Sequence, residues 1–283
     1  MNELTTNNQF KKLTSLTGWI FLIAAFAAVY YPVLSSLVKS WNSSDDYSHG
    51  FLILPLSAYI LWQNRDTLAA QPVKGSWFGL PMALFALFLY VFGKFGSILS
   101  LPPVSMIIFI WSAVIFFFGF QIFRSCSFPL LFLLFMIPVP SQIYAALTNP
   151  LQFIVTKVTV AMASMLGVII YREGNVIHLS DMTFQVVQAC SGLRSIMTML
   201  TLGAIFGYFT LRSPYLRLIL IAAGIPIAIA INIFRVFTMV IAYNYFKFNL
   251  TEGTPHTILG LLVFALGLVF FIIFQKGLAK CEK

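Results

Sequence analysis

Long apolar stretches separated by short polar segments run along most of the chain. A helix of about 20 apolar residues crosses a bilayer core of roughly 30 Å. Their continuous apolar character excludes a transmembrane β-barrel, whose strands would alternate in hydrophobicity over short segments. We therefore predict an all-α, polytopic membrane helical bundle. Its eight predicted crossings lie at residues 17–36, 49–62, 77–92, 104–123, 128–138, 192–211, 215–245 and 255–274.

A ninth apolar stretch, residues 149–170, carries the polar side chains Gln152, Thr156, Lys157 and Thr159. The distribution of basic residues bears on whether it crosses, because Lys and Arg collect in cytoplasmic loops. With eight crossings and both termini in the cytoplasm, most Lys and Arg fall in inner loops, whereas a ninth crossing would put one end of the chain on the wrong side. We therefore predict that residues 149–170 form an interfacial or re-entrant helix on the outer face.

The polar insertion at residues 171–188 has the composition of strands. Residues 176–179 and 183–187 are rich in β-branched side chains and are separated by Ser180-Asp181-Met182, which predicts a short hairpin. On the predicted topology this hairpin lies on the outer face and leads directly into Cys190. We expect residues 1–283 to form a single integral membrane domain.

The composition agrees with a membrane protein. Of the 283 residues, 60% are hydrophobic, 16% are aromatic and only 9% are charged, whereas soluble domains carry roughly 25% charged residues. This excludes a water-soluble fold of this size. The net charge of +9 reflects the basic inner loops rather than a nucleic-acid site, because no basic patch is interleaved with exposed aromatic residues. The expected surroundings are a lipid bilayer, without nucleic acid.

Cys190 differs from the other two cysteines in its position. On this topology Cys126 and Cys281 lie near the inner face, and we expect both to be ordinary buried residues. Cys190 lies at the outer end of the helix that begins at residue 192, so neither can pair with it. A helix N-terminus and a nearby cation, here Arg194, stabilise a thiolate. The pattern indicates a nucleophilic cysteine.

Two further residues are unusual for their positions. Arg235 lies inside an apolar helix, where an arginine costs at least about 2.5–3.5 kcal/mol on insertion scales, so it indicates a functional site more than a snorkelling side chain. His256 follows Pro255 at the outer mouth of the last helix, where a purely interfacial role is the alternative. We predict that Cys190, Arg235 and His256, on three helices, converge on one pocket in the outer leaflet.

These three residue types suffice for acyl transfer. A thiolate attacks a peptide carbonyl and forms a thioester, His256 can take the thiol proton and return it to the leaving amine, and Arg235 can stabilise the oxyanion. Glu252 could orient the ring of His256 or be an ordinary loop acid facing outward. No metal-ligand pattern involves the outer cysteine, so we expect neither a metal nor a cofactor.

Several motifs resemble the exosortase/archaeosortase family of membrane-embedded cysteine transpeptidases. The resemblance rests on residues 189–195 (Ala-Cys-Ser-Gly-Leu-Arg-Ser), 232–235 (Asn-Ile-Phe-Arg) and 253–256 (Gly-Thr-Pro-His). Residues 47–51 (Tyr-Ser-His-Gly-Phe), the following Pro-Leu-Ser and the Ile-Pro-Val-Pro turn reinforce it, so that it covers most of the chain from about residue 45 to 275. A histidine at position 256, where the archaeal branch tends to have arginine, favours the bacterial type.

The resemblance implies the substrate, the location and the residue roles. Exosortases are thought to cleave PEP-CTERM proteins, whose C-terminal signal is a Pro-Glu-Pro motif, a transmembrane segment and a basic tail. They would transfer these proteins to an acceptor, whose identity stays open, in bacteria that make extracellular polysaccharide. The location implied is the inner membrane, with the site facing the periplasm. The catalytic residues implied are Cys190, Arg235 and His256, and Arg194, Ser191 and Glu252 are candidates for substrate binding.

Two other classes of function use arginines in or near a membrane. An anion transporter or channel would hold its ligand with Arg194 and Arg235, but it is expected to show paired half-helices, and no internal repeat is seen. A polysaccharide polymerase or lipid-linked glycosyl transferase also uses outward-facing arginines. Those enzymes do not need a cysteine, so Cys190 distinguishes them from a transpeptidase. An inactive scaffold and hydrolysis instead of transfer stay open.

Overall fold

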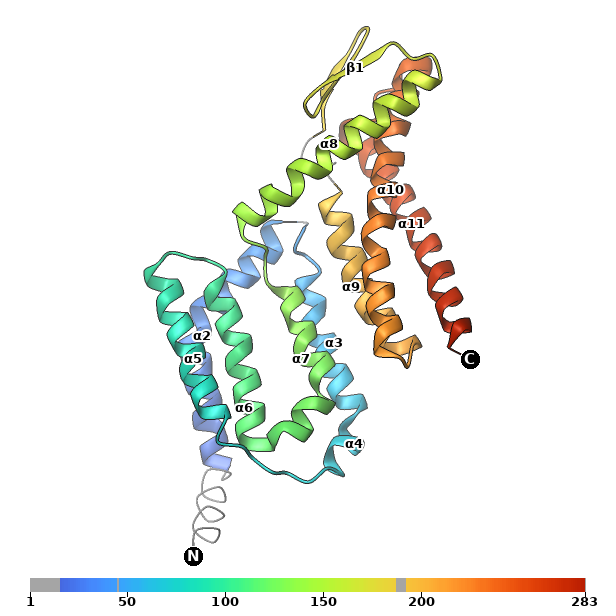
Figure 1. Ribbon diagram of the computed structural model, residues 1–283. Helices are drawn as coiled ribbons and strands as arrows, with labels where there is room; N and C mark the ends of the chain where they lie inside the picture. Colours follow the sequence, from blue (N-terminus) through green and yellow to red (C-terminus); the bar gives the residue numbers. More distant parts are fainter. Residues whose placement is uncertain (1–15, 45, 187–191, 283) are drawn as a thin grey trace, which may run out of the picture. The chain divides into compact units, whose positions relative to one another are not determined.

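The computed structural model describes residues 16–44, 46–186 and 192–282. The chain divides into two compact units, residues 1–138 and 139–283, and each is described by itself. Figure 1 shows that helices make up most of both units, with one small sheet in the second. The single domain expected from the sequence stays a prediction.

The first unit consists of helices joined by short connections. Tight packing joins α5 and α6, because a Cβ atom at Gly79 would lie only 2.6 Å from Phe116 Cβ. The indole Nε1 of Trp41 donates a hydrogen bond to the Met136 carbonyl at 2.9 Å, so α2 is tied to the end of η1. The elements are α2 (Leu16–Ser43), α3 (Gly50–Gln63), α4 (Arg65–Ala69), α5 (Gly79–Phe95), α6 (Leu101–Ser125), α7 (Ser127–Phe132) and the 3-10 helix η1 (Leu133–Met136).

The second unit places a small antiparallel sheet between two of its helices in the sequence. The elements are α8 (Ser141–Met165), β1 (Ile170–Glu173), β2 (Val176–Leu179), β3 (Thr183–Gln185), α9 (Leu193–Thr210), α10 (Pro214–Phe246) and α11 (Gly253–Cys281). The strand order is β1-β2-β3. The predicted hairpin is confirmed as β2 and β3, which pair His178 with Thr183. Strand β1, which pairs Tyr171 with His178, was not predicted from the sequence.

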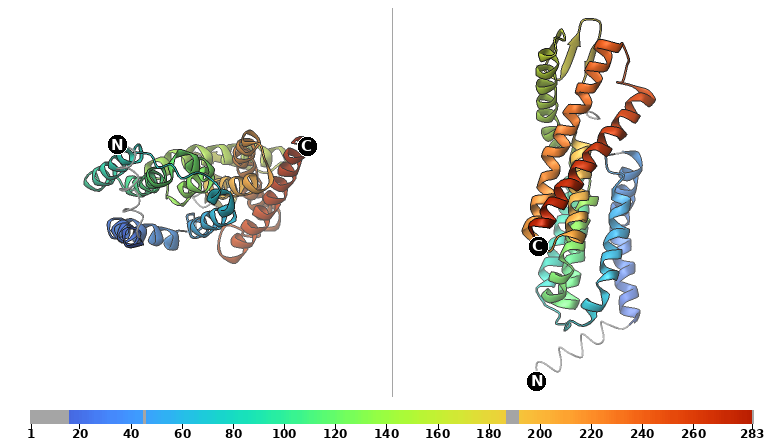
Figure 2. Two further views of the ribbon diagram at one scale, coloured as in Figure 1. Left: turned by 90° about the horizontal axis from the view of Figure 1, so that it is seen from below. Right: turned by 90° about the vertical axis from the view of Figure 1, so that its right-hand side faces the viewer.

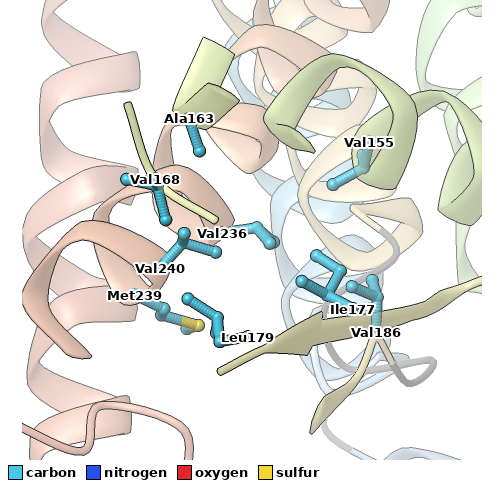
Figure 3. Packing of buried hydrophobic residues seen from close by; sticks show 9 residues of the cluster. All are labelled: Val155, Ala163, Val168, Ile177, Leu179, Val186, Val236, Met239 and Val240. Atoms are coloured by element: carbon cyan, nitrogen blue, oxygen red, sulfur yellow. The ribbon is translucent and has the colours of Figure 1, made fainter. Parts of the chain in front are cut away.

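An apolar cluster joins α8, the sheet and α10 within this unit. Val155 and Ala163 from α8 and Val236, Met239 and Val240 from α10 meet Ile177 and Leu179 of β2, with Val168 and Val186 beside them (Figure 3). Ile177, Ala163 and Val240 have no exposed surface. Close packing of such side chains adds many small dispersion contacts. This cluster therefore holds the sheet against the two helices.

Glycines allow close packing among α9, α10 and α11. A Cβ atom at Gly224 of α10 would lie 3.2 Å from the Met199 backbone of α9, and one at Gly267 of α11 would overlap Ile231 of α10. Small residues of this kind let membrane helices approach each other. Figure 2 shows α10 and α11 side by side, with the C-terminus at the end of α11.

The helices match the predicted apolar stretches closely, and the multi-pass helical bundle is confirmed. Within the described residues, five helices (α2, α6, α9, α10 and α11) are long and apolar enough to cross a membrane, or six if residues 127–136 and 141–165 count together as one broken span. The shorter apolar helices α3 and α5 correspond to the predicted stretches 49–62 and 77–92. Eight crossings stay a prediction.

The helix predicted at residues 149–170 has different bounds. It is α8, which begins at Ser141 after Pro140 and ends at Met165, so that Ile170 already belongs to β1. Pro150 lies inside α8, whereas it was the second residue of the predicted helix. Whether α8 lies at the membrane interface stays a prediction.

Candidate active site

Arg235 lies in α10 with a half-buried side chain that faces α11. A Cβ atom at Gly260 of α11 would lie 3.0 Å from Nη2 and 3.2 Å from Cζ of Arg235. Gly260 follows His256 by four residues, so both lie on the same face of α11. The guanidinium therefore reaches the backbone of α11 because position 260 has no side chain.

A hydrogen bond joins Arg235 to His256. The distance between Arg235 Nη2 and His256 Nε2 is 2.9 Å. A guanidinium has no acceptor atom, so Arg235 donates and the lone pair of Nε2 accepts. The other ring nitrogen, Nδ1, lies 3.1 Å from the carbonyl oxygen of Leu250, to which it can only donate. Both contacts together assign a neutral imidazole with its proton on Nδ1.

The Leu250 carbonyl takes the place that the sequence analysis considered for the carboxylate of Glu252. Glu252 is exposed and precedes α11 in an extended conformation, with φ −139° and ψ 159°. The backbone of the α10–α11 connection therefore orients the His256 ring. Glu252 therefore does not orient His256 in this structure. Its exposed position before α11 agrees with the alternative given from the sequence, an ordinary loop acid.

The remaining predicted site residues lie on or before α9. Cys190 and Ser191 lie outside the described residues. Arg194 is the second residue of α9, and its side chain is exposed. α9 begins at Leu193, three residues after Cys190 in the sequence, and the placement of the thiol at the N-terminus of this helix stays a prediction.

Gly192 and Asn232 occur in two of the quoted motifs but received no role from the sequence, and in the structure they lie against each other. Gly192 has φ +82° and ψ −3°, a left-handed conformation that favours glycine. A Cβ atom there would lie 3.1 Å from Cβ and Cγ of Asn232, whose side chain is 2% exposed. Asn232 precedes Arg235 by one helical turn. The chain thus enters α9 against the part of α10 that carries Arg235. An asparagine within an apolar helix was the signal in the sequence, because buried amides need partners.

Comparison with known proteins covers most of both units. The family model described as Transmembrane exosortase (Exosortase_EpsH) matches residues 41–273. The chain belongs to the transmembrane exosortase family. The matched region of this exosortase family member includes Cys190, Arg235 and His256. Comparison with curated proteins and with solved structures gave no match.

The other two cysteines of this exosortase family member differ from each other. Cys126 is buried among Ile122 and Leu130, as expected for an ordinary small core residue. Cys281 is exposed, so the expectation that it is buried was wrong. It lies in the last turn of α11, between Lys280 and Glu282, beyond the apolar part of the helix. Cys281 is therefore accessible for use as a control in thiol experiments.

Proposed function

We propose that this chain is a membrane-embedded cysteine transpeptidase that cleaves the C-terminal sorting signal of PEP-CTERM proteins and transfers them to an acceptor. The observation that carries the proposal is the hydrogen bond between Arg235 and His256, in a chain of the transmembrane exosortase family. An intramembrane arginine and a neutral imidazole in contact provide an oxyanion donor and a proton acceptor, which are the two groups that a nucleophilic cysteine requires.

Connectivity supports the inclusion of Cys190 in this site. Cys190 precedes Gly192 by two residues, a length of chain that spans at most about 7 Å. Gly192 lies against Asn232, one turn before Arg235 on α10. A thiol attached this close to Asn232 is within the range from which a bound substrate carbonyl could contact both the sulfur and the guanidinium.

The proposed reaction proceeds through a thioester. The Cys190 sulfur forms a bond to the scissile carbonyl carbon while its proton passes to Nε2 of His256, and Arg235 donates a hydrogen bond to the oxyanion that results. Collapse of the tetrahedral intermediate breaks the C–N bond, and the imidazolium returns the proton to the leaving amine. An acceptor nucleophile then attacks the thioester carbonyl and gives its proton to Nε2 of His256, and breaking of the C–S bond releases the Cys190 thiolate, which takes up that proton. Water in place of the acceptor would give hydrolysis by the same steps.

The geometry adds one requirement to this sequence of steps. In the resting arrangement, Nε2 of His256 is occupied by the hydrogen bond from Arg235. His256 can take the thiol proton only after the guanidinium leaves Nε2, and a substrate carbonyl that accepts from Arg235 draws it away. Substrate binding would thus free the base at the moment when it is needed.

The location and the substrate contacts follow from the same proposal. The protein would lie in the bacterial inner membrane with both termini in the cytoplasm and the site facing the periplasm, and it would act in connection with extracellular polysaccharide production. Arg194, Ser191 and Glu252 would bind the substrate near its Pro-Glu-Pro motif. The exposure of Arg194 and Glu252 supports contact with a substrate that comes from outside the fold.

The test is processing of a co-expressed protein that carries a PEP-CTERM tail. We expect tail removal by the wild type and by Cys281→Ala, a control at an exposed cysteine, and complete loss in Cys190→Ala. Membrane levels of all three proteins are measured by immunoblot. Normal processing by Cys190→Ala at wild-type abundance would refute the proposal. The mass of the product distinguishes transfer, which adds the acceptor, from hydrolysis.

A further inference from the structure

A buried polar network ties the turn between β1 and β2 to α8. Gln152 and Thr156 of α8 are 7% and 0% exposed. The Thr156 hydroxyl lies 2.9 Å from the Gln152 carbonyl and 3.4 Å from the carbonyl of Gly174 in the turn. Buried polar side chains are costly unless they are hydrogen-bonded. An apolar residue would serve as well at a site that needed packing alone, so these polar side chains indicate that the position of the turn matters.

Asn175 is the centre of the network. Its side-chain Nδ2 donates to Oε1 of Gln152 at 3.0 Å and to the carbonyl of Val186 at 3.2 Å. Its own backbone carbonyl accepts from the N–H of Val186 at 2.9 Å. Asn175 therefore binds both backbone polar groups of Val186 and connects them to α8. This arrangement extends the pairing of β2 with β3 by one residue beyond Gln185.

Val186 is also held by its side chain. It is 2% exposed and belongs to the apolar cluster with Val155 and Ile177 (Figure 3). Cys190 follows Val186 by four residues. On the other side of Cys190, Gly192 lies against the buried side chain of Asn232. The chain is thus fixed at two points that flank the cysteine, one by α8 through Asn175 and the other by α10.

We propose that Asn175, held by Gln152, is a positioning residue for the Cys190 nucleophile. This inference rests on the proposed function, in which Cys190 attacks the substrate. The side-chain amide of Asn175 sets the point from which the chain runs toward Cys190, and through it the placement of the thiol near the start of α9. An error of about 1 Å in such placement can cost about 100-fold in rate, which is why a hydrogen-bonding amide rather than an apolar side chain occupies position 175.

Isosteric variants at position 152 separate this role from general support of the fold. Gln152→Met removes the acceptor at almost constant volume, whereas Gln152→Glu keeps an oxygen that accepts from Asn175 Nδ2. Asn175→Asp replaces the donor by a carboxylate that only accepts and faces two other acceptors. Arg172→Ala is the matched control, because exposed Arg172 donates to the same turn, at the Gly174 carbonyl 3.1 Å away, without contacting Asn175.

Two measurements on the full-length protein test the proposal. The first is kcat and KM for a PEP-CTERM substrate, and the second is the rate of Cys190 alkylation by iodoacetamide in a Cys126→Ser, Cys281→Ser background without substrate. For Gln152→Met and Asn175→Asp we expect kcat and the alkylation rate to fall about tenfold or more. We expect KM to stay near that of the wild type. The thermal midpoint should fall, because a polar group loses its hydrogen-bond partner, so both rates are expressed per amount of folded protein. Gln152→Glu should recover most of both rates, and Arg172→Ala should match the wild type.

Several results would overturn the proposal. Equal rates for Gln152→Met and Gln152→Glu would do so, and so would losses that only follow the amount of folded protein. If Asn175→Asp does not fold, the pair of variants at position 152 decides. A failure of the proposed function is recognised separately, by normal processing in Cys190→Ala, because the alkylation rate reports the placement of the thiol without any substrate.

Discussion

The guanidinium of Arg235 in α10 donates a hydrogen bond of 2.9 Å to Nε2 of His256 in α11. The contact engages the lone pair that the proposed mechanism uses as a base, while the Leu250 carbonyl accepts from the other ring nitrogen at 3.1 Å. The same two residues therefore contact each other at rest, and in the proposed mechanism they would act on different atoms of the reacting groups. Variants that keep one property of His256 and remove the other can separate these roles.

His256→Gln is the variant that keeps the acceptor and removes the proton carrier. The amide oxygen of glutamine can accept from Arg235 in the place of Nε2, but it cannot take up the thiol proton. If His256 carries the proton, the rate of tail removal falls by about 100-fold or more. The rate is measured as a function of pH in isolated membranes. A loss of less than about threefold, with an unchanged pH profile, would show that His256 serves only to hold Arg235.

Gly260→Ala tests whether the guanidinium needs its close approach to α11. The added methyl group would lie 3.0 Å from Arg235 Nη2, so the guanidinium must shift by a few tenths of an ångström, which disturbs its hydrogen bond to Nε2 of His256. We expect processing to fall about tenfold or more while the protein still inserts into the membrane.

Gly277→Ala on the same helix is the control for Gly260→Ala. Its methyl group would meet nothing within 4 Å, and replacing a helical glycine by alanine stabilises a helix by roughly 0.5–1 kcal/mol. We expect full processing and a slightly higher thermal midpoint. Equal processing by the two alanine variants would contradict the importance of the contact between Gly260 and Arg235.

The sequence predicted the helices well because an uninterrupted apolar run has few other stable forms in a membrane. It predicted β2 and β3 from their β-branched residues, but not β1, where Tyr171, Arg172 and Glu173 are exposed and show no alternation of apolar and polar positions. The start of α8 was placed too late, at residue 149, because residues 141–148 are less uniformly apolar, whereas the helix begins at Ser141 directly after Pro140.

For the site, the sequence identified the chemical groups but not the contacts between them. Arg235 and His256 were singled out because each is unusual for its position. Their hydrogen bond depends on how closely α10 and α11 pack, which is set in part by Gly260. The link from Gln152 through Asn175 joins residues 23 positions apart. No local pattern of residues predicts such a contact, because it arises only when the sheet packs on α8.

The carboxylate of Glu282 predicts a dependence of stability on pH at the end of α11. It accepts hydrogen bonds from the backbone N–H groups of Arg212, at 2.8 Å, and of Ser213. Both hydrogen bonds lower the pKa of Glu282 below the usual value for glutamate, and the one from Arg212 has the larger effect. A lowered pKa means that the contribution to stability is fully present above the unfolded-state pKa and is lost as the pH falls through the folded-state pKa.

Glu282→Gln should therefore remove this acid-sensitive contribution. We expect the thermal midpoint of the variant to be below that of the wild type at neutral pH and the two to converge as the pH falls below the ordinary glutamate range. The effect is small, because Glu282 is at the surface and exposed charges are screened. Thermal unfolding of the purified protein over a series of pH values is the measurement. A constant difference between the two proteins at all pH values would contradict the assignment.

Gly192→Ala tests the entry of the chain into α9, and Gly167→Ala provides a control with the same backbone strain. The two glycines have φ +82° and +79°, so an alanine at either position costs roughly 1–2 kcal/mol from the left-handed conformation alone. Only the methyl group at position 192 meets a neighbour, Asn232, at 3.1 Å, whereas the one at position 167 meets nothing within 4 Å. We expect similar losses of stability for both variants. Only Gly192→Ala should lose processing, by about tenfold or more, because displacement of residue 192 moves the chain that carries Cys190 relative to Arg235.

Thermal midpoints and processing rates measured on the same preparations separate the loss of stability from the loss of processing. Equal processing rates for the two variants would show that the contact between Gly192 and Asn232 supports the fold and does not place the nucleophile.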